Sequence, residues 1–111
     1  MISFDVVREA ALEMPDVESS ESARGPALKL RGKLMACPAS HKSAEPDTIM
    51  VRVSIKEREK LIDENPDLYY VTDHYRDYPA LLVRLAKIDR TTLKSLLGAS
   101  WLFVSEKAAR K

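Results

Sequence analysis

Residues 27–37 have the pattern of a β-hairpin. Apolar and charged residues alternate through Ala27-Leu28-Lys29-Leu30-Arg31, and alternation with period two is typical of a strand with one buried face. Gly32 and Lys33 follow, and residues 34–37 form a second apolar run. Because strands joined by a short Gly-containing turn pair side by side in opposite directions, this segment predicts an antiparallel sheet.

A third strand leads directly into a helix. Ile49, Val51 and Val53 alternate with more polar neighbours, and Ser54 followed three residues later by Glu57 forms a capping box. Asn65-Pro66 ends the helix, because the residue before a proline disfavours helical geometry. We place the run from Glu57 to Lys60 on the solvated face of this helix.

The remaining segments complete the order α-β-β-β-α-β-β-α. An amphipathic helix extends from Ser3 to Pro15, residues 68–71 and 80–85 predict strands, and Asp89 caps a final helix. Residues 15–26 and 38–47 are rich in Ser, Pro and charged residues and predict loops. At 111 residues the chain fits one domain, residues 1–111. We expect a two-layer α+β fold, with helices covering one face of an antiparallel sheet.

Charge is unevenly distributed along the chain, although its net value is only +1. Residues 23–44 carry five basic residues and no acid, and residues 80–111 carry seven basic residues against two acids. The chain has one cysteine, which excludes an internal disulfide framework and favours the reducing cytoplasm. No stretch approaches the ~20 apolar residues of a membrane-spanning helix, so no membrane association is expected.

An ordered set of segments resembles a known family. ALKLRGKLMA, MVRVSIKERE, NPDLYYVTDHYRDYPALLVRL and LLGASWLFVSEK follow one another along the chain, and together they resemble the MmcQ/YjbR family of small bacterial proteins. The resemblance implies a two-layer fold similar to that of type III secretion chaperones. It also implies a protein without an established catalytic residue or cofactor, commonly described as DNA-binding. Asp73 and the long loop 38–47 depart from the family pattern.

Strand alternation places four basic side chains on the sheet face opposite the helices. If the apolar residues of each strand face the helices, Lys29, Arg31, Arg52 and Arg84 face the other way, with Met50 and Leu82 among them and Lys33 near by. Phosphate groups would suit such a surface, and so would a protein partner or a second copy of the chain. Alternatively, the long basic side chains simply cover an open sheet.

The segment from His74 to Pro79 is the densest polar and aromatic stretch. Tyr75 and Tyr78 could stack on bases, and His74 could act as an acid or base, although a structural loop explains the same residues. We expect Cys37 to be an inert thiol, Trp101 to be core, and His41 to ligate no metal. The prediction is therefore a non-enzymatic protein without metal or cofactor. It binds DNA weakly through Lys29, Arg31, Lys33, Arg52, Arg84, Tyr75 and Tyr78, or uses the same face for protein interaction or self-association.

Overall fold

A computed structural model describes residues 2–22 and 25–109. The elements in chain order are α1 (Phe4–Leu12), β1 (Val17–Ser22), β2 (Gly25–Leu30), β3 (Lys33–Pro38), β4 (Thr48–Arg52), α2 (Ile55–Glu64), β5 (Tyr69–Tyr70), the 3₁₀ turn η1 (Asp73–Tyr75), β6 (Ala80–Arg84) and α3 (Arg90–Ala109). The strands form one antiparallel sheet in the order β1-β2-β3-β4-β6-β5. The expected α+β fold is confirmed.

The strand β1 was not expected, since residues 15–26 were predicted to form a loop. β1 is an edge strand whose register pairs Val17 with Leu30 and Glu18 with Lys29. Its sequence, VESSES, has one apolar residue, and Val17 alone packs against the main core. The strand is defined by backbone pairing to β2, which a search for apolar alternation cannot detect.

The β2–β3 hairpin turns at two residues with positive φ, Arg31 at 49° and Gly32 at 82°. Left-handed geometry at both positions is the requirement of a two-residue type I′ turn, whose twist matches that of the flanking strands. The predicted hairpin is confirmed. Arg31, however, lies in the turn and not in the strand, so alternation does not determine the direction of its side chain.

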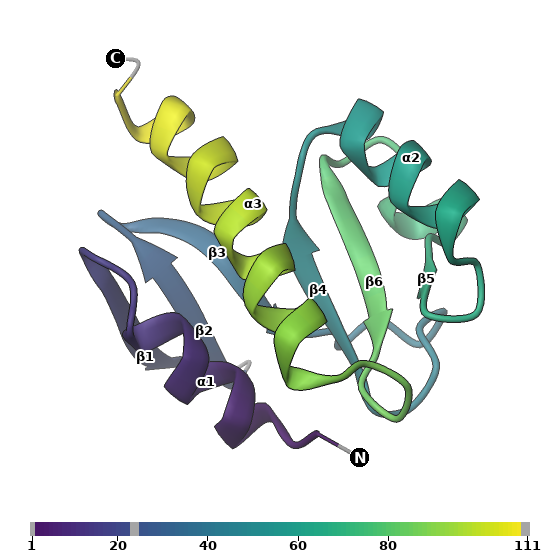
Figure 1. The fold of residues 1–111 in the computed structure, drawn as a ribbon, viewed down its shortest axis with the longest axis horizontal. Coiled ribbons are helices and arrows are strands. Elements are labelled where there is room, and N and C mark those ends of the chain that lie inside the picture. The colour runs from purple at the N-terminus through teal and green to yellow at the C-terminus, as the bar shows by residue number, and fades with distance from the viewer. Residues whose placement is uncertain (1, 23–24, 110–111) are drawn as a thin grey trace.

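All three helices lie on one face of the sheet (Figure 1). α3 crosses β2, β3 and β4, α1 packs beside β1 and α3, and α2 lies over β5 and β6. The predicted caps are present: Ser54 Oγ accepts the Glu57 backbone N–H at 3.1 Å, and Asp89 Oδ1 accepts that of Thr92 at 2.7 Å. Ser3 occupies the N-cap position of α1 without a capping hydrogen bond from its side chain.

The main core lies between these helices and the sheet. It contains every residue that alternation assigned to the helix side: Leu28, Leu30, Ile49, Val51, Val53, Leu81, Val83 and Leu85. Trp101, expected in the core, is half-buried at its margin, where its Nε1–H donates to the Pro15 carbonyl at 2.9 Å. Within residues 2–22 and 25–109 no helix is long and apolar enough to cross a membrane.

Candidate functional site

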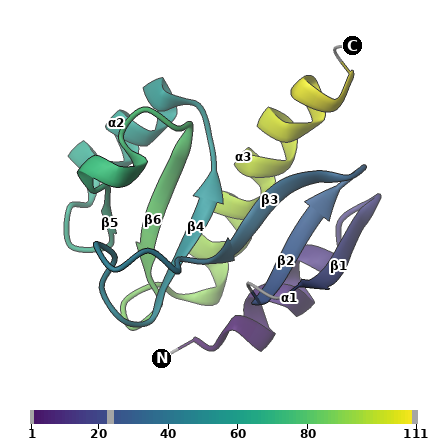
Figure 2. The same ribbon diagram turned by 180° about the vertical axis from the view of Figure 1, so that it is seen from behind.

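The sheet face opposite the helices is covered over β4 and β6. Met50 and Leu82 are only 5% and 0% exposed there, in a small cluster closed by Ala39, Ala44 and Tyr75. In Figure 2 the loop between β3 and β4 crosses this side of the sheet. The expectation of an open face with these two apolar residues exposed is therefore wrong at β4 and β6, because the loops after β3 and β5 fold back over them.

Side-chain contacts join these two loops. Ser43 Oγ lies 2.8 Å from Thr72 Oγ1, and the rings of His41 and His74 stack 3.5 Å apart at 7°. His41 Nδ1 accepts the Ser43 backbone N–H at 3.1 Å, which requires that nitrogen to be unprotonated. Desolvation lowers the pKa of His41, and the charges of His74 and Lys42 lower it further. Sequence reasoning treated the two histidines separately, since 33 positions in the chain divide them.

Arg84 is fully engaged in a local network. Its Nε and Nη2 donate to the two carboxylate oxygens of Glu45 at 3.0 and 2.8 Å, and Nη1 donates to the carbonyls of Pro66 and Asp67. The guanidinium also lies over the Tyr70 ring, 4.3 Å from its centre. The hydrogen bonds from Arg84 lower the pKa of Glu45. Arg84 therefore fixes the β3–β4 loop to the sheet.

Arg52 and Arg31 are also paired. Arg52 Nε donates to the Pro79 carbonyl at 3.2 Å, and its guanidinium lies over the rings of Tyr78 and Phe103 at 4.7 and 5.4 Å. Arg31 Nη2 forms an exposed ion pair with Asp16 Oδ2 at 3.0 Å. Tyr78, expected to stack on a ligand, instead stacks on Arg52.

Lys29 and Lys33 point to opposite sides of the sheet. Lys33 pairs in register with Leu30, whose side chain lies in the main core, so Lys33 is on the helix side. Lys29 is on the opposite face, directly across from Glu18 of β1. Within residues 2–22 and 25–109 neither lysine has an ion-pair partner.

The part of this face over β1, β2 and β3 holds a cavity of about 520 Å³, which we call the open-face groove. Its apolar part comes from Leu34, Met50, two prolines and an alanine, and its polar part includes Lys29, His74, Tyr75 and two serines. The full lining is Ser20, Gly25, Pro26, Ala27, Lys29, Gly32, Leu34, Cys37, Pro38, Ser40, Met50, His74 and Tyr75. Of the seven residues expected to bind DNA, the groove brings together Lys29 and Tyr75.

Cys37 is half-buried in the groove, and burial raises the pKa of its thiol. A raised pKa reduces the thiolate fraction and with it the nucleophilicity of the sulfur. Within the described ranges, 2–22 and 25–109, no group of three or more His, Cys, Asp or Glu residues could hold a metal ion. Tyr75, the groove's aromatic wall, stands edge-on to His74 at 4.8 Å.

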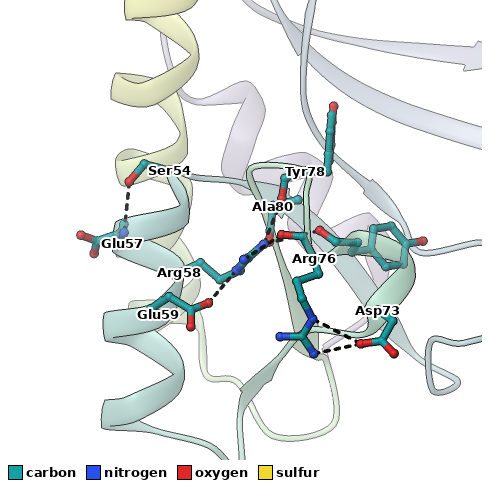
Figure 3. A network of polar contacts seen from close by, with 9 residues as sticks. Ser54, Glu57, Arg58, Glu59, Asp73, Arg76, Tyr78 and Ala80 are labelled. Carbon is teal, nitrogen blue, oxygen red and sulfur yellow. Dashed lines mark hydrogen bonds and ion pairs between the residues drawn. The ribbon is translucent and has the colours of Figure 1, made fainter.

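Arg58 positions the 75–80 segment beside the groove, and sequence reasoning missed it. Its side chain is buried, with the residue only 2% exposed. Nη1 donates to the carbonyls of Tyr75, Tyr78 and Ala80, and Nη2 to that of Arg76 at 2.9 Å (Figure 3). The prediction of a solvated face from Glu57 to Lys60 is wrong at this residue. The helical spacing of Ile55, Arg58, Leu61 and Ile62 predicts one inner stripe and placed Arg58 on it, which its burial confirms, although Ile55 itself is 44% exposed.

Two of the chain's relatives are mycobacterial proteins named as uncharacterized. The chain is 40% identical over 62 residues to these proteins of Mycobacterium bovis and Mycobacterium tuberculosis, which is 55% of this chain and 48% of each relative. The chain thus spans about half the length of the curated relatives it matches. No family model matches it.

Its fold is that of a solved structure. Deinococcus radiodurans protein DR2400, a DUF419 domain, superposes with a TM-score of 0.75, covering 100% of this chain and 84% of that chain. At 19% identity this similarity establishes the shared small α+β fold.

Proposed function

We propose that this protein is a non-enzymatic, cytoplasmic MmcQ/YjbR-like binding protein that holds an extended segment of a partner protein in the open-face groove. The observation that carries the proposal is the groove itself, with about 520 Å³ of space over the sheet. Ligand sites are typically concave, of about 300–1,000 Å³, mostly apolar and equipped with a few polar groups. Leu34 and Met50 supply the apolar floor, and Lys29 and Tyr75 the polar groups.

The charges on this face favour a peptide over DNA. A phosphate backbone needs several free cations along a track, but Arg31, Arg52 and Arg84 are engaged with groups of the protein itself. The groove lining holds a single lysine, Lys29, and no arginine, and Lys29 lies across from Glu18. Such a site suits a segment with one acidic group between apolar side chains.

The neighbouring edge strand favours a different protein over a second copy of this chain. β1 is at the end of the sheet, and extended peptides bind such edges by adding a strand. If two copies paired antiparallel about Ser19 and Ser20, Glu18 of each would oppose Glu21 of the other. Like charges directly opposite each other destabilise strand pairing.

The test is a selection of displayed random peptides on the full chain, followed by fluorescence anisotropy of the enriched peptides. Lys29→Glu is the test variant, and Lys33→Glu is its matched control, with the same charge change on the other side of the sheet. Peptide binding that is lost in Lys29→Glu and kept in Lys33→Glu supports the proposal. Failure to enrich any peptide, or equal binding by both variants, refutes it.

A labelled mixed-sequence duplex in the same assay tests the DNA alternative. Phosphate contacts predict affinity that drops steeply between about 50 and about 200 mM salt. Duplex binding of that kind, reduced by Lys29→Glu and kept in Lys33→Glu, would assign the face to DNA and overturn the peptide proposal. Thermal unfolding of each variant checks that the fold is retained.

A further inference from the structure

A second cavity lies on the helix side of the sheet, between α2 and α3, away from the open-face groove. It measures about 400 Å³, and we call it the interhelical cavity. Leu61, Leu96 and Ala99 contribute its apolar part. The full lining is Glu57, Leu61, Glu64, Asn65, Tyr69, Thr92, Ser95, Leu96 and Ala99. Nothing in the proposed function uses this cavity.

The charge in the interhelical cavity is exclusively negative. Glu57 and Glu64 are the charged members of the lining, and no basic residue belongs to it. In the part of the chain that the structure describes, neither carboxylate forms an ion pair. Glu64 also ends α2, where the unpaired helix carbonyls attract positive charge. The cavity is therefore suited to a cation.

Tyr69 independently indicates a ligand. The residue is only 5% exposed, yet its hydroxyl has no hydrogen-bond partner among residues 2–22 and 25–109. Every fully buried side-chain polar atom in those ranges has a partner, so the hydroxyl is not fully enclosed, and the residue lines the interhelical cavity. Desolvation raises the pKa of Tyr69, and the negative charges of Asp89 and Glu64 raise it further. A positively charged group beside the hydroxyl would be attracted by the negative charges of Asp89 and Glu64.

The spacing of the two carboxylates defines the ligand. Glu57 and Glu64 are seven residues apart on α2, so they lie on one helix face about 10 Å apart along its axis. Leu61 lies on the same face between them. We propose that the interhelical cavity binds a linear aliphatic polyamine, with a terminal ammonium group at each glutamate and the methylene chain against Leu61 and Leu96. The Tyr69 hydroxyl accepts a hydrogen bond from one ammonium.

The experiment is isothermal titration calorimetry of the full chain with three amines. Spermidine spans both carboxylates, whereas 1,4-diaminobutane is too short and butylamine carries one charge. We expect spermidine to bind tightest. Glu57→Gln and Glu64→Gln should each weaken it roughly five- to tenfold, and Tyr69→Phe roughly threefold. Asp63→Asn is the matched control: it removes an exposed acid of α2 outside the cavity lining and should leave spermidine affinity unchanged.

Two results would overturn the proposal directly: no spermidine binding up to about 1 mM, or equal binding by the Glu57→Gln/Glu64→Gln double variant. Butylamine binding as tightly as spermidine would overturn the two-point contact. A peptide with two lysines that bound tighter than spermidine would assign the cavity to a protein partner instead. Lys29→Glu should bind spermidine normally, so the outcome is independent of the open-face groove.

Discussion

Replacement of Arg58 by alanine tests whether one buried guanidinium holds the 75–80 segment in place. The substitution removes donors to four carbonyls, of Tyr75, Arg76, Tyr78 and Ala80. The Arg58 contact to Ala80 is buried, and the contacts to the other three are partly buried. Solvent can therefore replace some of the lost hydrogen bonds but not all.

The expected loss of unfolding free energy is large. A buried acceptor left unsatisfied costs about 1–3 kcal/mol, and the removed aliphatic stem leaves space in a packed region. Together these effects predict a loss of about 3–4 kcal/mol for Arg58→Ala, against a typical total of about 5–15 kcal/mol. For a domain of this size the midpoint of thermal unfolding should fall by roughly 12–20 °C. The free energy of unfolding of Arg58→Lys should lie between those of the wild type and Arg58→Ala. One ammonium group cannot reach all four carbonyls that two guanidinium nitrogens contact.

Urea unfolding and thermal unfolding measure this difference, with Arg76→Ala as the control. The backbone carbonyl of Arg76 accepts a hydrogen bond from Arg58, but among residues 2–22 and 25–109 the Arg76 side chain makes only an exposed ion pair with Asp73. Loss of such a pair costs about 1 kcal/mol or less. If Arg58→Ala lost no more than this control, the carbonyl network would not be what stabilises the segment, and the reasoning would be refuted.

Four further substitutions test other parts of the structure. Gly32→Ala should destabilise the protein by about 1–2 kcal/mol in urea unfolding because φ is +82° there. Gly98→Ala, in α3, should stabilise the protein by up to about 1 kcal/mol. If both substitutions stabilised the protein, or both destabilised it, the argument from backbone conformation would be contradicted. Arg84 lowers the pKa of Glu45. The ion pair of Glu45 and Arg84 therefore stabilises the fold at pH values above about 4.3, the pKa of a glutamate in the unfolded chain, and this stabilisation is lost as the pH falls through the lower pKa of the folded state. Glu45→Gln should therefore show a shallower loss of stability on acidification than the wild type, and equal slopes would contradict the pairing. The lowered pKa of His41 predicts an NMR titration midpoint below about 6.5, and a midpoint above it would argue against the stack. The unfolded state then takes up that proton first, so stability should fall as pH decreases from about 6.5 toward the folded value, and His41→Asn should remove this dependence.

Sequence reasoning succeeded where the signal was local. Gly32 in a two-residue turn, the Ser54–Glu57 cap and the alternation from Ile49 to Val53 each involve neighbours along the chain. Their geometry follows from backbone sterics and from which side chains need burial. Sequence reasoning failed at β1, because backbone pairing can hold an edge strand that has almost no apolar side chains, and its sequence then shows no apolar alternation.

The candidate site was less predictable, because it depends on segments far apart in the chain. Alternation correctly placed Lys29 opposite the helices, but it could not show that Arg84 meets Glu45, 39 positions away. A charged residue in a sequence is equally compatible with solvent, a ligand or an internal partner. Only the folded structure shows that three of the residues expected to contact phosphate, Arg31, Arg52 and Arg84, are already engaged with other groups of the protein.

By itself, the sequence determined the helices, every strand except β1 and the buried face of the sheet, because hydrophobic periodicity and capping act over a few residues. The tertiary structure decided which polar groups are left free. It buried Arg58, stacked His41 on His74, covered β4 and β6, and formed the open-face groove and the interhelical cavity on opposite sides of the sheet. Those outcomes depend on the path of loops across the sheet, which long-range contacts determine and local pattern does not.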